Sequence, residues 1–214
     1  MHERHEREIF QVRFRFLDLL KSFFLEAPDA ETMSRWRGTF SALALEQISP
    51  RFDNGVKEIC RALNNTTLKG LQEEYYRLFV NPFHGGRVET TASYYLNGRG
   101  YAQALVDIRG LMREAGVLKA EGVTDPEDSL VVMLDTFVAL LEEEKARGGE
   151  TMRRLQARLL EEFLEPFTEE FTAALKNNAQ ADFYYLCCRI LGGYLDLEKS
   201  LVCRSGGTAG PVAF

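Results

Sequence analysis

The sequence has little histidine and cysteine, and this scarcity limits the metal chemistry open to it. Of the three histidines in 214 residues, two fall within the first five positions, and only His84 lies further along. Helical bundles that bind two metals use Glu-x-x-His pairs, and the chain has none. The four cysteines (Cys60, Cys187, Cys188 and Cys203) show no Cys-x-x-Cys spacing, so we expect reduced, packed thiols rather than a zinc site or a disulfide. We therefore predict no metal site and no bound cofactor.

Catalytic signatures are also missing from the sequence. The chain has no Gly-x-Ser-x-Gly, no His-Glu-x-x-His and no phosphate-loop motif. Asp128 and Asp135 are the best-placed pair of acids, but no His or Lys lies near them in the sequence to share proton transfer. We predict that the protein is not an enzyme and has no catalytic residues.

Long apolar runs and a basic charge balance are absent as well. No stretch of about 18 apolar residues is present, so we expect no transmembrane helix. The start, MHERHERE, lacks the apolar core of a secretory signal, and we expect a cytoplasmic protein. The net charge of −6 argues against nucleic acid as a partner. It leaves room for a cationic peptide, because acidic clefts steer positive ligands.

Helical periodicity is what the sequence has in abundance. Apolar side chains recur every three or four residues through most of the chain, whereas strand-like alternation is missing. We predict an all-α fold, a single-domain bundle of about nine or ten helices over residues 1–203, followed by a flexible tail at 204–214. The clearest helices are predicted at 3–25, 29–47, 53–63, 68–79, 101–116, 124–144, 150–175 with a kink or break at Pro166, and 180–201.

The periodicity lapses over residues 81–100. This stretch, NPFHGGRVETTASYYLNGRG, contains one proline, four glycines and several β-branched or hydroxyl side chains, which disfavour helix. A connection of this length inside a compact domain is more often functional than idle. We expect a long functional loop here.

The stretch TDPEDSLVVMLDTFVALLEEE, residues 124–144, combines an apolar centre with carboxylates seven residues apart. Asp125 is the predicted N-cap and Pro126 the first helical residue. Seven residues make nearly two helical turns, so Asp128, Asp135 and Glu142 would lie in line on one helix face. Such a line is either a solvated edge or, together with the neighbouring loop, one wall of a partly acidic groove for a peptide.

A regulator of transcription is the alternative function. Many all-α proteins of this length bind DNA through a basic recognition helix. The best candidate for such a helix, residues 57–69 (KEICRALNNTTLK), is only mildly basic and has no clear tight turn before it. An all-helical, ligand-responsive transcription regulator therefore remains the second interpretation.

Four short segments resemble, in the right order, motifs of the TorD/DmsD/NarJ family of chaperones for molybdenum-containing redox enzymes. The segments are Glu74–Phe79 (EYYRLF), Ala92–Leu96 (ASYYL), Pro126–Leu130 (PEDSL), and Phe163–Phe167 (FLEPF) followed by Phe171. Ser129 stands where the family has histidine, Ala92 where it has glutamate, and Phe163 and Phe167 where it has His and Trp. The resemblance spans roughly residues 70 to 195.

The resemblance implies a cytoplasmic, single-domain chaperone that binds the twin-arginine signal peptide of a molybdoenzyme catalytic subunit. Such a protein retains its client until the molybdopterin cofactor is inserted, and export follows. Carried over by position, Tyr75, Leu78 and Phe79 would form an apolar wall for the peptide. The polar corner would comprise Pro126, Asp128 and Ser129, with Ser93 and Tyr95 from the loop.

Asp135 is added to the peptide site from helical spacing alone, because the family motifs do not include it. A twin-arginine peptide presents two guanidinium groups and then an apolar, helix-prone run, which suits a groove with carboxylates at one end.

The oligomeric state is left open by the sequence. Long hinge loops allow helix exchange between protomers, so both a monomer and a domain-swapped dimer are compatible with it.

Overall fold

The protein is described here by a computed structural model in which residues 2–81, 83 and 86–206 are placed. Within these residues it consists of ten α-helices and two short π-helical segments, and its only β-pairing is one isolated bridge. The predicted all-α fold is confirmed. In chain order the elements are α1 (His2–Leu25), α2 (Ala30–Leu43), α3 (Pro50–Asn65), α4 (Leu68–Tyr75), η1 (Tyr76–Val80), α5 (Ala92–Asn97), α6 (Gln103–Ala115), α7 (Leu130–Arg147), α8 (Glu150–Leu159), η2 (Leu160–Leu164), α9 (Glu165–Lys176) and α10 (Phe183–Gly206).

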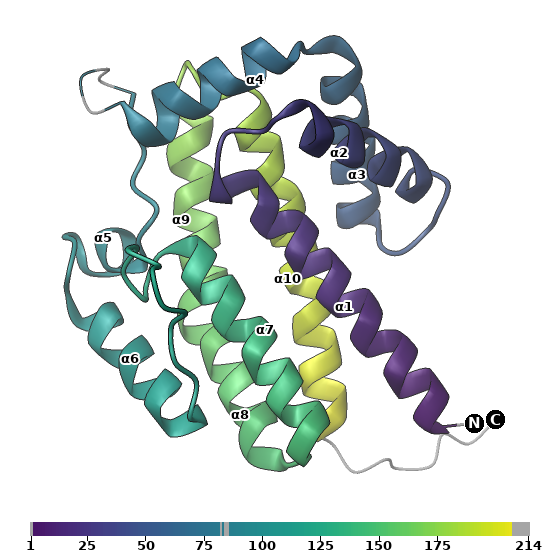
Figure 1. The fold of residues 1–214 in the computed structure, drawn as a ribbon, viewed down its shortest axis with the longest axis vertical. Coiled ribbons are helices and arrows are strands. Elements are labelled where there is room, and N and C mark those ends of the chain that lie inside the picture. The colour runs from purple at the N-terminus through teal and green to yellow at the C-terminus, as the bar shows by residue number, and fades with distance from the viewer. Residues whose placement is uncertain (1, 82, 84–85, 207–214) are drawn as a thin grey trace.

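The long helices α1, α7, α8, α9 and α10 form the body of the bundle (Figure 1). Helices α2, α3 and α4 cover one end of it, and α5 with α6 lies along one side, next to α8 and α9. Helix α10 is central, since it packs against α1, α3, α4, α8 and α9. No described helix has both the length and the apolar composition needed to cross a membrane.

Aromatic side chains fill the core where α1, α2 and α10 meet. The Phe23 ring lies 4.7 Å from Trp36, 5.8 Å from Phe40 and 5.9 Å from Phe183, measured between centroids. All four side chains are buried, and the Trp36 indole N–H donates to the Ser22 hydroxyl at 2.8 Å. Burial of each such ring contributes roughly 2–3 kcal/mol from the hydrophobic effect alone.

Glycines on α10 permit the close approach of α3. A Cβ at Gly193 would lie 3.2 Å from the backbone Cα of Phe52, at the start of α3. Since backbone atoms cannot yield as a flexible side chain can, only glycine fits at this contact without displacing α3.

A buried ion pair joins α1 to α10. The Arg13 guanidinium lies 2.6 Å from the Glu198 carboxylate, whose side chain has no solvent exposure. The Tyr194 hydroxyl donates to the same carboxylate, and Gln156 on α8 accepts a longer bond of 3.4 Å from Arg13. The bundle thus places a negative charge in its interior and neutralises it with a residue from the opposite end of the chain.

Two π-helical segments interrupt otherwise regular helices. η2 connects α8 to α9, so the helix predicted over 150–175 is divided just before Pro166. Pro166 is the second residue of α9, which follows η2 directly, so its missing N–H falls where the π-helical segment gives way to α-helix. η1 ends the helix predicted over 68–79. Residues 86–91, called the connecting segment below, then lead to α5.

Two local predictions are wrong. The stretch 81–100 is not loop throughout, because α5 lies within it. The helix predicted from 124 begins only at Leu130, and its N-cap is Ser129, whose Oγ accepts from the Val132 N–H, rather than Asp125. The reason is that the backbone of Asp128 and Leu130 is hydrogen-bonded to residues 90 and 92 instead of to the next helical turn.

The C-terminal boundary also differs from the expected one. Helix α10 continues to Gly206, so the first three residues of the predicted tail are helical. The remainder of that tail, 207–214, lies outside the described residues, as does His84.

Candidate functional site

A short backbone bridge brings two of the four motif segments together. Thr91 and Ser129 form an isolated antiparallel bridge. The Ala92 N–H donates to the Asp128 carbonyl at 2.8 Å, and the Leu130 N–H donates to the Thr90 carbonyl at 2.9 Å. Residues 93, 126, 128 and 129, which were predicted to form one polar corner, are therefore close in space although the chain between them forms α5 and α6.

The carboxylate of this corner fixes helices rather than facing solvent. Asp128 is 1% exposed, and its Oδ2 accepts from the Ser93 N–H at 2.9 Å, which caps the start of α5. The Ser93 hydroxyl in turn accepts from the Leu105 N–H on α6 at 3.3 Å. Ser129 is buried too and caps α7, whereas Pro126 is only half-buried. In this structure Ser93, Asp128 and Ser129 offer no surface to a peptide, which corrects the prediction that they line an open groove.

The predicted apolar wall lies mainly in the core. Leu78 is fully buried, and Tyr75 is 8% exposed with its hydroxyl donating to the Phe24 carbonyl at 3.3 Å. The family motif placed both on a peptide-facing wall, but in the structure they face inward, and the Tyr75 ring lies 5.7 Å from Tyr184 of α10. Only Phe79 of the three is partly exposed. Burial, with a smaller effect from the nearby Asp125 carboxylate, raises the pKa of Tyr75 to about 12.

Tyr95 connects this apolar cluster to the corner. Its ring lies 5.5 Å from Phe167 and 6.0 Å from Phe171, and Phe171 also contacts Phe79, at 6.4 Å. The Tyr95 hydroxyl donates to the Glu89 carbonyl at 3.0 Å, and its pKa is raised chiefly by burial. Tyr95 is therefore an anchor for the connecting segment as well as a site candidate.

Backbone hydrogen bonds join the connecting segment to the predicted apolar wall at 75–79 on one side and to the polar corner at 126–129 on the other. The Val88 N–H donates to the Leu78 carbonyl at 2.8 Å, and two residues later Thr90 accepts from Leu130. Residues 75–79 and the corner at 126–129 are thus neighbours, separated by one extended strip of backbone at 88–92.

A hollow opens beside this strip. It has a volume of about 450 Å³ and lies between the connecting segment, α5 and the C-terminal end of α9. Its apolar lining comes from Tyr94, Tyr95 and Val88, and its polar lining includes Glu89 and Asn178. Tyr95 is the one predicted site residue that reaches it.

Several exposed apolar side chains lie on η1, on the segment that follows it and on α5, and one of them, Tyr94, lines the hollow. Tyr76 is 54% exposed, Val80 49%, Phe83 93% and Tyr94 47%. All four lie on η1, on the segment that follows it, or on α5. An apolar side chain exposed on a surface is ordinary when isolated, but several within a short stretch of chain, one of them lining a hollow, make this region a candidate interaction site.

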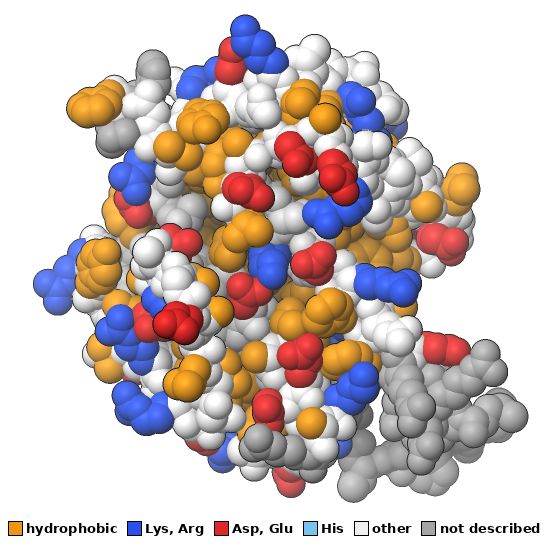
Figure 2. All heavy atoms as spheres, viewed as in Figure 1, with side chains coloured by type: hydrophobic (Ala, Val, Ile, Leu, Met, Phe, Trp, Pro, Cys, Tyr) orange, Lys and Arg blue, Asp and Glu red, His pale blue; other side chains and the backbone are white. Residues whose placement is uncertain are grey.

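The predicted acidic line is shorter than expected. Asp128 precedes α7 and is buried, so only Asp135 and Glu142 lie on its exposed face. Asp135 forms an ion pair with Lys21 of α1, with 2.7 Å between Oδ1 and Nζ. Acidic and basic side chains are interspersed over the face that includes α1 and α7 (Figure 2). A continuous acidic wall is therefore absent from α7.

Glu74, the first residue of the first motif segment, has a buried carboxylate to which the resemblance assigned no role. Its Oε1 accepts from the backbone N–H groups of Asp182 and Tyr184, both at 2.9 Å, and so caps the start of α10. Burial raises the pKa of Glu74 to about 7, against the opposing effect of these hydrogen bonds. The cap is therefore close to half-protonated near neutral pH.

The raised pKa predicts a pH dependence of stability. The folded state binds the Glu74 proton more tightly than the unfolded state, so this contribution is complete below the ordinary value of 4.5 and is lost as pH rises through about 7. We expect the parent to lose stability relative to Glu74→Gln between about pH 5 and pH 8, measured by urea unfolding. Glu73→Gln is the control, because it removes an exposed neighbour and keeps Glu74, so its stability should follow the same pH dependence as the parent's. Parallel curves for parent and Glu74→Gln would contradict the prediction.

Comparison with known proteins shows what fold and family these features belong to. A family model described as nitrate reductase delta subunit matches residues 46–173, which is more than half of the chain. The chain belongs to the nitrate reductase delta subunit family. The resemblance to the TorD/DmsD/NarJ chaperones is thereby confirmed, and the matched range contains all four motif segments.

A solved structure supports the fold of this family member. The chain superposes on the crystal structure of a "putative redox enzyme maturation protein" from Archaeoglobus fulgidus with a TM-score of 0.54 and 18% identity, covering 86% of this chain and 93% of that one. A search of curated proteins found no match. The nitrate reductase delta subunit family is one of maturation chaperones rather than of catalysts, and it is not a family of transcription regulators, which was the alternative interpretation.

Proposed function

We propose that this chaperone binds the amino-terminal leader of a molybdenum-containing oxidoreductase subunit in the cytoplasm and retains the apo-subunit until its cofactor is inserted, before export. The observation that carries the proposal is the hollow lined by Tyr94 and Tyr95, because the Tyr94 side chain is 47% exposed there. A helix-prone apolar segment requires such a surface, and a few aromatic side chains usually supply most of the binding energy. Family membership supports a molybdoenzyme subunit as the partner.

The proposed contact surface differs from the one expected from motifs. Tyr95 and Phe79 remain in it, joined by Tyr94 and Tyr76. Tyr75, Leu78, Ser93, Asp128 and Ser129 act behind this surface by fixing the connecting segment and α5. Asp135 would contribute a negative charge at a distance, and an arginine of the leader would compete with Lys21 for it.

The test is a titration with a synthetic peptide that contains two adjacent arginines followed by an apolar, helix-forming run. We expect Tyr94→Ala to weaken binding by about tenfold, because it removes an exposed ring from the lining of the hollow. Tyr101→Ala is the matched control: that ring is 80% exposed but lies outside the hollow. Isothermal calorimetry would give both affinities.

Charge is tested separately in the same titration. Asp135→Asn should weaken binding by a few-fold at low salt and by less at high salt, since exposed charges are screened. Equal binding by parent and Tyr94→Ala would refute the hollow as the peptide site. Equal binding by parent and Asp135→Asn would remove the carboxylate from the proposal and leave the apolar surface in place.

A further inference from the structure

The hollow lined by Tyr94 and Tyr95 contains one charged side chain of each sign. Of the described residues that line it, Glu89 is the only acid and Arg87 the only base. Both belong to the connecting segment, and Val88 between them is only 7% exposed. The segment therefore buries its apolar side chain and leaves the two charged ones partly exposed at the hollow.

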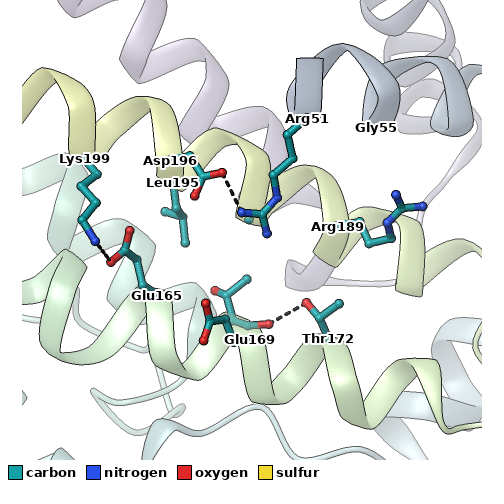
Figure 3. Close-up of a pocket in the computed structure, with 11 residues that line it drawn as sticks. Arg51, Gly55, Glu165, Glu169, Thr172, Arg189, Leu195, Asp196 and Lys199 are labelled. Carbon is teal, nitrogen blue, oxygen red and sulfur yellow. Dashed lines mark hydrogen bonds and ion pairs between the residues drawn. The ribbon is translucent and has the colours of Figure 1, made fainter. Parts of the chain in front are cut away.

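The contact between these two charges is loose. Arg87 Nη2 lies 3.6 Å from Glu89 Oε1, which is within ion-pair distance but too long for a hydrogen bond. In the second hollow, between α3, α9 and α10, charged side chains are paired closely instead, as with Arg51 and Asp196 at 2.6 Å (Figure 3). No described residue donates a hydrogen bond to the Glu89 carboxylate, and that side chain is 38% exposed. Its oxygens are therefore acceptors that a ligand can reach.

The backbone around Glu89 is already fixed by hydrogen bonds. The Asn178 amide donates to the Gly86 carbonyl at 2.6 Å, and the Tyr95 hydroxyl donates to the Glu89 carbonyl at 3.0 Å. Between them, the Val88 N–H donates to a carbonyl of η1 at 2.8 Å. A ligand that binds the Glu89 carboxylate would therefore order one side chain rather than a loop, which lowers the entropic cost of binding.

An exposed aromatic ring accompanies this carboxylate. Tyr94 is 47% exposed and lines the same hollow, and its ring meets the Tyr95 ring edge to face with the centroids 5.1 Å apart. A guanidinium is planar, so it binds a carboxylate through two parallel N–H donors and stacks on an aromatic face. A reachable carboxylate and an open ring in one hollow therefore favour an arginine side chain over a lysine.

We propose that Glu89 accepts an arginine of the leader and that Arg87 occupies this acceptor until the leader binds. This role of Glu89 rests on the proposed function, since the arginine belongs to the leader. The two charges balance without a leader, so the incoming guanidinium takes the place of Arg87 instead of adding to it. Arg87 is 46% exposed and would move into solvent at small cost, because an exposed ion pair contributes little. The leader's arginine gains hydrogen bonds that Arg87 does not make.

Single variants test this exchange in the leader titration by isothermal calorimetry. We expect Glu89→Gln to weaken binding about tenfold, because charge-assisted hydrogen bonds are lost. Arg87→Ala should strengthen binding by a few-fold, because it removes the competing cation. Glu170→Gln is the matched control, an exposed acid one turn before Ala174 on α9 that does not itself line the hollow. Its effect should be much smaller, as expected of a solvent-screened charge.

A double variant separates competition for Glu89 from general electrostatics. If Arg87 acts by occupying Glu89, Arg87→Ala should have little effect in the Glu89→Gln background. Loss of a positive charge near a cationic peptide would instead strengthen binding in both backgrounds. A leader with citrulline in place of both arginines keeps their shape without their charge, so it should bind the parent and Glu89→Gln equally. A leader with two lysines should bind the parent more weakly than the arginine leader does.

The outcomes distinguish this role of Glu89 from the leader site itself. A loss of affinity in Tyr94→Ala without a loss in Glu89→Gln would refute Glu89 as the acceptor and leave the hollow as the leader site. Unchanged binding in both variants would refute the hollow as the leader site, and the role of Glu89 with it. Equal losses in Glu89→Gln and Glu170→Gln, or equal strengthening by Arg87→Ala in both backgrounds, would overturn the exchange.

Discussion

Replacing Glu198 with alanine is expected to lower the free energy of unfolding by about 3–5 kcal/mol. The side chain is fully buried and receives hydrogen bonds from Arg13 and Tyr194. Removing it leaves the Arg13 guanidinium, which is only 14% exposed, without its counter-charge between α1 and α10. Urea unfolding followed by circular dichroism measures the change.

Asp196→Ala is the matched control, because it removes an ion pair of the same kind from the same helix. Its partner Arg51 is 60% exposed and Asp196 itself 48%, so the loss should be within about 1 kcal/mol. Similar losses in the two variants would show that the interior pair does not stabilise the junction of α1 and α10 more than a surface pair does.

Phe171→Ala should also lower the free energy of unfolding by about 3–5 kcal/mol. The ring is fully buried and contacts Phe167 at 5.2 Å, Phe24 at 5.9 Å and Tyr95 at 6.0 Å. Its loss would leave a cavity where α1, α5 and α9 meet, and rigid neighbouring helices limit how far that cavity can collapse. Thermal and urea unfolding both report the change.

Phe83→Ala is the corresponding control, since that ring is 93% exposed and buries little surface. We expect its effect to remain within about 0.5 kcal/mol. Because Phe83 lies near the proposed leader site, the same variant also separates the two roles of aromatic residues: Phe171 should affect stability, and exposed rings should affect only binding. A large loss of stability in Phe83→Ala would contradict this division.

Helical periodicity predicted the fold because burial of one face decides where helices form in a bundle. Local signals did less well where tertiary contacts compete with them. Asp125 and Pro126 have the chemistry of a helix start, but the bridge to Thr91 takes up the backbone groups that a helix there would need. Ser129, which departs from the family motif, serves as the cap instead.

The site was harder to predict than the fold, for a physical reason. An apolar residue with helical spacing faces either the core or a groove, and only the packing of the whole bundle decides that Leu78 is inside. Glu74 was missed because nothing in the local sequence distinguishes a buried carboxylate from an exposed one. The adjacent tyrosines Tyr94 and Tyr95 could have indicated an exposed aromatic side chain from the sequence, because neighbouring residues on a short helix face different directions.

The bridge between residues 90–92 and 128–130 has a consequence for how such chains can vary. The chain between these two points forms α5, which packs against α9, and α6, which packs against α8, and it returns to the bridge at residues 128–130. Insertions, deletions or a proteolytic nick in the exposed stretch 118–125 would therefore leave the α7–α10 scaffold in register.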